Sequence, residues 1–494
     1  MKISAVTESI DRRADWLFSL SDAIFDRPET AFQEYFASEL LRDALRREGF
    51  EVTEGLGGLP TAFCGRFGAG GPVIGILGEY DALPGMSQQS GVTHPEPVIP
   101  GAAGHGCGHN LLGVGSLAAV IAVKDYLEAN RLPGTVIYYG CPGEEGGAGK
   151  GFLARAGVFD GVDCVLTWHP ASLNTTPPRT SLANRQMLYQ FRGISAHAAA
   201  HPERGRSALD ALTLMNTGIQ FLREHIPATA KIHYAVLDAG GTSPNVVQSS
   251  ASAMYLIREA SQEALEPLVQ RVSNVARGAA LMTETEVTVT FVKSCANLIP
   301  NRVLSGLLCR NLAQMPLPEY TAEELALAKA MKETIPTVSP LFSMAKGLGG
   351  AYARFSDEHV DEPIHNILIP ELPIPMVPST STDVGDVSWL APTAEVQICT
   401  ACSNTAGHTW QRTAQGKSAP AHKGLLQAGR VLAGAAIDLL TDPDLVAQAR
   451  REWQHQLRGR AYTPMPPEAA PQFPGKEPGN DKLLFADQFL KMSE

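Results

Sequence analysis

Hydrophobic and polar residues follow a helical period in the first fifty residues of the chain. Residues 8–48 predict two helices joined near Pro28. The apolar positions of the second helix recur at helical spacing: Phe32, Phe36, Leu40, Leu41 and Leu45. A third and more apolar helix is predicted over residues 111–129, ending at the Pro133-Gly134 stop signal.

Three short, continuous apolar runs predict buried strands, at residues 72–77, 135–139 and 164–168. Each run is followed at once by polar residues with reactive side chains. These are Glu79 and Asp81 after the first run, Glu144 and Glu145 after the second, and His169 after the third. Open α/β sheets bind ligands beyond the carboxyl ends of their strands, so the pattern predicts a site at this edge.

The pattern changes at about residue 186. Strands are then predicted at 186–192, 233–238, 245–258 and 286–292, and helices at 207–226 and 261–281. This β-α-β-β-α-β order resembles a ferredoxin-like unit inserted in a larger domain. We therefore predict a domain at 186–299, between the two parts of another domain at 1–185 and 300–494.

After Pro300 a mixture of helices and strands resumes. The sequence predicts a loop-rich region at 336–378, a strand at 396–399 and an apolar helix at 423–440. Six prolines lie between residues 464 and 478, so the last thirty residues are predicted to form an irregular tail.

Composition excludes several classes of function. The 494 residues are 44% hydrophobic and 18% charged, with a net charge of −11 and a pI near 5.7, which argues against a nucleic-acid-binding surface. The first ten residues lack the apolar core of a signal peptide, and the apolar stretches 111–123 and 431–440 are shorter than a membrane span. Eight scattered cysteines do not form a disulfide framework, so we expect a cytoplasmic protein with no membrane contact.

Residues 101–110, Gly-Ala-Ala-Gly-His-Gly-Cys-Gly-His-Asn, contain the densest chemistry. His105, Cys107 and His109 lie on a glycine-rich turn directly before the apolar helix. Thiolate and imidazole ligands suit a transition metal, and glycine allows a tight turn around an ion. The turn could also be a simple loop with exposed histidines, so the later motifs decide between the two interpretations.

Two of those motifs have simpler explanations of their own. Adjacent acids such as Glu144-Glu145 are usually solvated, and His169 could be an ordinary core histidine. Their position after buried strands favours a site, in which one carboxylate binds a metal and the other takes a proton from water. Spacing alone does not bring His408 to these residues.

Other motifs are incomplete. Cys399-Thr-Ala-Cys402 lacks a second cysteine pair, and Gly146–Lys150 lacks the spacing and the Ser/Thr of a P-loop. The chain also lacks the G-x-S-x-G and H-E-x-x-H motifs, which excludes serine hydrolases of the elbow type and zincins.

Taken together, Cys107-Gly-His109, Glu144-Glu145, His169 and Ser195-Ala-His197 resemble the M20 family of di-metal amidohydrolases. The resemblance extends from about residue 79 to residue 410. It is to the Cys-x-His branch, which includes aminoacylase-like enzymes, auxin-conjugate hydrolases and p-aminobenzoyl-glutamate hydrolases. Within this branch, the stretches 104–113, 381–389 and 416–423 are most similar to the p-aminobenzoyl-glutamate hydrolase group.

The resemblance implies an α/β fold: a catalytic domain with a mixed β-sheet flanked by helices, and an inserted α+β ferredoxin-like lid or dimerisation domain. It also implies two divalent metal ions (Zn, Mn or Co), with Cys107 shared between them. The residues that match the family's metal ligands are Cys107, His109, Glu145, His169 and His408.

The resemblance further assigns roles around the metals. Glu144 matches the general base, and Asp81 matches the aspartate that orients a ligand. His197 matches the lid histidine that reaches the active site of the partner protomer and polarises the scissile carbonyl. Asn245 and Arg258 match groups that hold the substrate carbonyl and carboxylate.

This chain departs from many branch members at Glu79 and Asn110, where those members have aspartate. We expect hydrolysis of the amide bond of an N-acyl or aroyl amino acid with a free carboxylate, such as p-aminobenzoyl-glutamate. The alternatives are an acyl-amino-acid deacylase or dipeptidase of the same family, a protein that uses metal only structurally, and a non-catalytic member of a hetero-oligomer. A homodimer is expected, with a related second subunit as the alternative.

Overall fold

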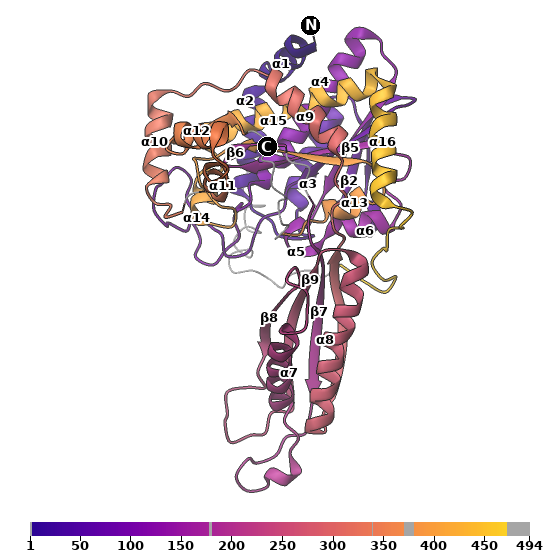
Figure 1. Ribbon diagram of the computed structural model, residues 1–494, viewed down its shortest axis with the longest axis vertical. Helices are drawn as coiled ribbons and strands as arrows, with labels where there is room; N and C mark the ends of the chain where they lie inside the picture. The colour runs from indigo at the N-terminus through magenta and orange to yellow at the C-terminus, as the bar shows by residue number, and fades with distance from the viewer. Residues whose placement is uncertain (1, 177–179, 338, 370–379, 472–494) are drawn as a thin grey trace, which may run out of the picture.

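The computed structural model describes residues 2–176, 180–337, 339–369 and 380–471. It contains a broad catalytic module and a long, narrow lid that projects from it (Figure 1). The lid begins with strand β7 (Ala183–Arg192) and ends with strand β10 (Glu286–Cys295). The elements on both sides of it in sequence form the catalytic module.

The catalytic module is built on a six-stranded mixed sheet in the order β1-β2-β4-β3-β5-β12. Strands β4, β3, β5 and β12 run parallel, while β1 and β2 are antiparallel to their neighbours. The strands are β1 (Glu51–Glu54), β2 (Phe63–Ala69), β3 (Val73–Glu79), β4 (Gly134–Cys141), β5 (Cys164–Ala171) and β12 (Thr393–Cys399). A small parallel pair joins β6 (Leu173–Asn174) to β11 (His365–Leu368).

Helices cover both faces of this sheet, because its central strands are apolar on both sides. Ile76 and Tyr138 belong to one hydrophobic core with helices α4 and α15, whereas Leu77 and Tyr139 belong to another with Phe152. The helices of the catalytic module are α1 (Lys2–Asp11), α2 (Ala14–Asp26), α3 (Tyr35–Arg47), α4 (His109–Asn130), α5 (Glu144–Gly147), α6 (Gly149–Arg155), α9 (Arg302–Gln314), α10 (Ala322–Lys332), α11 (Pro340–Leu348), α12 (Gly350–His359), α13 (Val384–Ser388), α14 (Trp410–Ala414), α15 (Ala419–Thr441) and α16 (Pro443–Leu457). The fold class predicted from the sequence is thus confirmed.

Helix α4 is the central helix of the core. By length and composition alone its 22 residues are long and apolar enough to cross a membrane, contrary to the sequence-based expectation for this stretch. In the structure 89% of its most apolar window is buried, mainly against α15 and the sheet. Its apolar character is therefore that of a core helix.

The lid is a four-stranded antiparallel sheet in the order β10-β7-β9-β8, with two helices packed on one face. Its remaining elements are α7 (Ala208–Arg223), β8 (Lys231–Asp238), β9 (Ser250–Glu259) and α8 (Gln262–Thr283), with 3-10 turns at Leu56–Gly58 in the catalytic module and Pro202–Arg204 in the lid. The β7-α7-β8-β9-α8-β10 order and this strand arrangement are ferredoxin-like, as predicted.

The beginning of the chain differs from the prediction. Three helices (α1 to α3) replace the two that were expected, and Phe32 lies in the loop before α3 with a φ of +65°. Phe32 is completely buried, and its ring packs against the glycines of the α5 turn. Tertiary packing, rather than helical spacing, explains why this position is apolar.

The region 336–378 is more regular than predicted. Its described residues form α11, α12 and β11, and Phe342 stacks on Phe355 and contacts His365. Residues 370–379 lie outside the described residues. The predicted tail is described only as far as residue 471, where Met465 and Ala469 are buried in the core and Arg155 donates to the Pro466 carbonyl (2.6 Å).

Candidate metal centre

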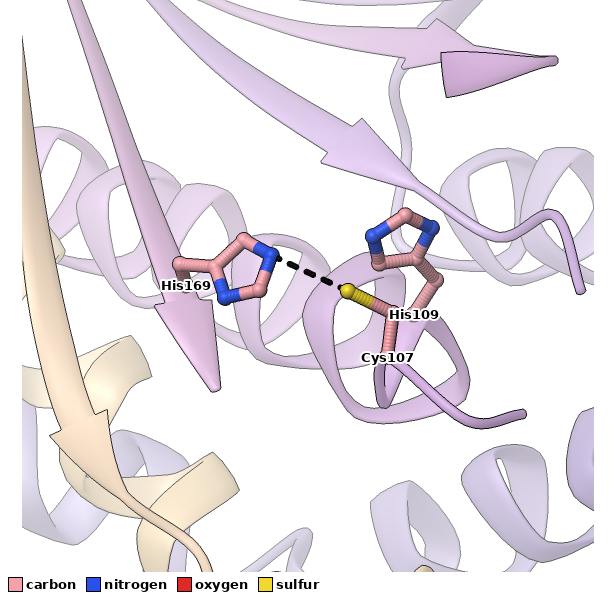
Figure 2. A group of neighbouring side chains, drawn as sticks. All are labelled: Cys107, His109 and His169. Carbon is pink, nitrogen blue, oxygen red and sulfur yellow. Dashed lines mark hydrogen bonds between the residues drawn. The ribbon is translucent and has the colours of Figure 1, made fainter. Parts of the chain in front are cut away.

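The glycine-rich turn and the end of β5 meet beside the carboxyl end of the sheet. Sγ of Cys107 lies 3.4 Å from Nε2 of His169, and the ring of His109 lies across from that of His169, with centroids 5.8 Å apart. Figure 2 shows the three side chains converging, with the sulfur between the two rings. Their ligand atoms all lie within 4.8 Å of one another, close enough to hold one ion.

A second set of ligands shares the same cysteine. Cys107, Glu145 and His408 also have ligand atoms within 4.8 Å of one another, and Nε2 of His408 is 3.2 Å from Oε1 of Glu145. The backbone explains how a residue three hundred positions away arrives here, because the N–H of His408 donates to the Gly106 carbonyl (2.8 Å). The five predicted ligands therefore form two sets that meet at Cys107.

Asp81 connects the two sets. Its Oδ1 accepts a hydrogen bond from Nδ1 of His109 (2.8 Å), and its Oδ2 accepts one from the backbone N–H of Glu145 (2.9 Å). This leaves Nε2 of His109 facing inward. A carboxylate behind a histidine is the usual partner that orients a metal-binding imidazole.

The donor atoms fit divalent ions. Among the described residues, Nε2 of His109 and Oε1 of Glu145 are buried and make no hydrogen bond. Burial raises the pKa of the Cys107 thiol, but the imidazoles of His169 and His109 outweigh that effect and lower the pKa to about 6. A thiolate, imidazoles and a carboxylate are the ligand types of Zn and related transition metals.

Glu144 lies beside these ligands at the start of α5, in a turn made possible by Gly143 at a φ of +68°. Burial raises the pKa of Glu144 well above its usual value, and the nearby carboxylates Glu79 and Glu145 raise it further. A carboxylate held next to a metal site, with an elevated pKa, is suited to accept and return a proton.

One residue that holds this turn was missed in the sequence. Glu34 is completely buried, and its Oε1 accepts hydrogen bonds from the backbone N–H groups of Phe32 and Gly143 (both 2.9 Å). Glu34 also accepts from the hydroxyl of Thr61 (3.0 Å). No local pattern distinguishes Glu34 from a surface acid, because its partners are far away in sequence.

The rejected P-loop-like stretch contains a second missed residue. Lys150 is completely buried, and its Nζ lies 2.6 Å from both Oε1 of Glu79 and Oδ1 of Asp383. The departure at Asn110 has a structural explanation, since its amide donates to Ser21 (3.0 Å) and to the Gly416 carbonyl (3.1 Å). An ionised aspartate has no hydrogen to donate to these acceptors.

Two candidate residues lie far from this chain's own ligands. His197 and Asn245 are neighbours, because the N–H of Ala198 donates to the Asn245 carbonyl (2.9 Å). They follow the outer ends of the lid strands, whereas the pair Asn184–Arg258 lies at the inner ends. The eight residue steps from Asn184 to Arg192 span roughly 26 Å at about 3.3 Å per residue.

His197 is exposed, and its Nδ1 accepts hydrogen bonds from the backbone N–H groups of Ala199 and Ala200 (3.2 and 3.1 Å). In the neutral imidazole, Nε2 therefore carries the proton and is a donor. This arrangement gives the outer end of the lid a ready hydrogen-bond donor.

Arg258 lies at the inner end of the lid, next to the catalytic module. It donates to the hydroxyl of Ser381 (2.8 Å), and none of the described carboxylates forms an ion pair with it. Nearby, Nζ of Lys293 donates to the backbone carbonyl of Glu145 (3.3 Å). The structure therefore places Arg258 with the chain's own site and separates it from Asn245.

The fold and the site define a hydrolase, and the chain belongs to the peptidase family M20/M25/M40, whose model matches residues 75–364. The chain is 44% identical to one of the two subunits of the p-aminobenzoyl-glutamate hydrolase of Escherichia coli K12, over 94% of this chain and 98% of that protein. It is 28% identical to the Xaa-Arg dipeptidase of Mus musculus, over 91% of this chain and 92% of that protein.

Solved structures share the fold. An aminobenzoyl-glutamate utilization protein from Klebsiella pneumoniae superposes with a TM-score of 0.55 at 18% identity, covering 85% of this chain and 98% of that one. A dinuclear metal-binding M20-family peptidase from Bacillus subtilis superposes with a TM-score of 0.52 at 19% identity, covering 87% and 99%. The sequence-based assignment to the M20 family and to amidohydrolases is confirmed.

Proposed function

We propose that this hydrolase cleaves the amide bond of p-aminobenzoyl-glutamate or a closely related aroyl amino acid, using two divalent ions. The observation that carries the proposal is the pair of ligand sets that share Cys107, with Glu144 beside both. The 44% identity to a p-aminobenzoyl-glutamate hydrolase protein of E. coli supports the substrate. Zn, Mn and Co all suit these ligands.

Cys107, His109 and His169 would hold one ion, and Cys107, Glu145 and His408 the other. Ions bound there supply Lewis acidity to the scissile carbonyl and to the attacking water. Glu144 takes a proton from that water and returns it to the leaving amine. Asp81 keeps His109 in the tautomer whose Nε2 faces the ligand cluster.

Groups of the lid complete the site. Arg258 pairs with the free carboxylate of the substrate through charge-assisted hydrogen bonds. The Nε2–H of His197 donates to the carbonyl oxygen as it gains negative charge, with Asn245 beside it. Since His197 and Asn245 lie at the outer end of the lid, they act in the site of a second protomer.

We propose a homodimer formed through the lid. Strand β8 is the edge of the lid sheet and exposes Tyr234, Val236 and Leu237, while Phe221 and Leu281 are 70% and 82% exposed. Exposed apolar residues on an edge strand favour pairing with another chain. A hetero-oligomer with a related protein is the alternative, since two different E. coli subunits of one hydrolase are both similar to this chain.

The test is hydrolysis of p-aminobenzoyl-glutamate by the purified chain alone, with added Mn or Zn and with a chelator. We expect release of glutamate that the chelator abolishes and metal restores. Absence of release from a chain loaded with two ions would contradict the proposed substrate or the homodimer. Addition of a protein related to the other E. coli subunit, which is 29% identical to this chain over 226 residues, would then separate these two outcomes.

The similarity to Xaa-Arg dipeptidases supports a dipeptidase as the second candidate. A panel of p-aminobenzoyl-glutamate, N-acetyl amino acids and Xaa-Arg dipeptides distinguishes the two, since kcat/KM ranks the substrates directly. We also propose that the protein works in the cytoplasm, in keeping with eight free cysteines, and cell fractionation tests this location.

A further inference from the structure

Three charged side chains form a buried cluster behind the metal ligands. Lys150 and Asp383 are completely buried, and Glu79 is 2% exposed. Nζ of Lys150 lies 2.6 Å from Oε1 of Glu79 and 2.6 Å from Oδ1 of Asp383. Two carboxylates and one ammonium leave the cluster with a net charge of −1.

Asp383 fixes Lys150 at two points. Its Oδ2 accepts from the backbone N–H of Lys150 (2.9 Å), while its Oδ1 accepts from Nζ of the same residue (2.6 Å). Lys150 belongs to α6, directly after the turn that carries Glu144 and Glu145. The side chain of Lys150 therefore reaches β3 from a fixed base.

Because Lys150 holds one oxygen of Glu79, the other oxygen has a defined direction. Oε2 of Glu79 lies 3.3 Å from Nε2 of His109, and Glu79, His109 and Glu144 have ligand atoms within 4.8 Å of one another. Two ligands of one tetrahedral ion, each at about 2.0–2.1 Å, are separated by roughly 3.4 Å. The observed separation matches that geometry.

Nε2 of His109 is completely buried and makes no hydrogen bond within the described ranges of the chain. Its Nδ1–H is engaged by Asp81, so in the neutral ring Nε2 offers a lone pair. The facing oxygen of Glu79 is also an acceptor. A cation between these two acceptors satisfies both of them.

We propose that Glu79 is a further protein ligand of the ion held by His109, and that Lys150 and Asp383 are the positioning residues that keep its free oxygen on that ion. This inference rests on the proposed metal-dependent function and adds a carboxylate to its metal site. It also gives the buried lysine a function, because the ammonium neutralises part of the charge that would otherwise raise the pKa of the nearby acids.

The experiment measures the affinities for two Zn ions by competition with a chromophoric chelator, with no substrate present. In Glu79→Gln the shape is kept, Lys150 stays paired with Asp383, and the new amide competes for Nε2 of His109. We expect one ion to bind about 10- to 100-fold more weakly. Asp383→Asn is the matched control, since it removes the same charge from the cluster but leaves Glu79 in place; its affinities should stay within about 3-fold of the original.

Equal weakening in both variants, or none in Glu79→Gln, would overturn the inference. If Glu79→Gln does not fold by circular dichroism, Glu79→Asp replaces it, because it keeps the charge and withdraws the oxygen by one methylene. Unchanged affinity in Glu79→Asp would then overturn the inference, and a loss of about 10-fold or more would support it. The unaltered protein separates the two proposals, since its failure to bind two ions would overturn the proposed function itself.

Discussion

At the scale of single residues, one aspartate organises both ligand sets. The two oxygens of Asp81 hold the imidazole of His109 and the backbone of Glu145, so the ligands of both proposed ions depend on one side chain. Glu144 has no such anchor in common with the ligands. Its chemistry can therefore be removed without removing the metal ligands.

We predict that Glu144→Ala keeps both ions but loses turnover by about 100- to 10,000-fold, the usual contribution of a general base. Turnover of p-aminobenzoyl-glutamate and metal content by mass spectrometry are measured on the same sample. Near-normal kcat in this variant would show that another group takes the proton.

At the scale of secondary-structure elements, the turn that carries Glu144 and Glu145 is the most tightly constrained part of the site. Glu34 holds the N–H of Gly143, and the ring of Phe32 fills the space beneath the turn. A Cβ at Gly147 would lie 2.3 Å from the ring of Phe32, whereas a Cβ at Gly146 would meet only Ala31, at 3.2 Å.

We predict that Gly147→Ala destabilises the protein by about 1–3 kcal/mol, as overpacking of a filled core does, and lowers kcat because Glu144 moves. Gly146→Ala is the matched control, and its effect should stay below about 1 kcal/mol. Urea unfolding and steady-state kinetics measure both effects. Equal behaviour of the two variants would contradict the role of the Phe32 contact.

Another contact between elements responds to pH. Asp125 on α4 is half-buried; its burial raises its pKa, but hydrogen bonds from Arg13, Ser9 and Lys124 outweigh this effect and lower the pKa to about 2. Because the pKa is lower in the folded state, the ionised carboxylate stabilises the fold above the ordinary pKa of about 4. That contribution is lost as the pH falls from about 4 towards 2.

We predict that Asp125→Asn lowers stability at pH 7 and reduces its decline over this acidic range. Thermal unfolding of both proteins between pH 7 and pH 3 measures the difference. A constant difference between the two proteins at every pH would contradict the assignment to Asp125.

At the scale of the whole molecule, the lid separates the candidate groups. Arg258 lies at the inner end, beside the catalytic module, while His197 and Asn245 follow the outer ends of the strands. The long, narrow shape of the lid in Figure 1 agrees with this separation. In one chain, the site therefore lacks the donor that the lid carries.

We predict that Val236→Lys, on the edge strand β8, converts the dimer to a monomer by placing charge in the proposed interface. Light scattering should show half the mass, and kcat should fall while metal content stays the same. Leu325→Lys, on α10 of the catalytic module, is the control for an exposed leucine (37%) and should leave the dimer intact. A monomeric variant with full activity would contradict the action of His197 across the dimer.

The sequence by itself determined the elements and most of the chemistry. Apolar periodicity is local, so it located the central strands, α4 and the ferredoxin-like order of the lid. The ligands Cys107, His109, Glu145 and His169 follow turns and strand ends directly, and their positions are visible in the chain. The resemblance to the M20 family added His408, which spacing could not.

Only the tertiary structure decided the contacts that depend on distant segments. Glu34, Lys150 and Asp383 resemble ordinary charged residues until folding buries them and brings together partners up to 233 residues apart. Phe32 shows the same effect, because its ring packs beneath a turn formed more than a hundred residues later. Burial and pairing arise from the whole fold, whereas periodicity arises from neighbouring residues, and this difference separates what the sequence predicted from what it could not.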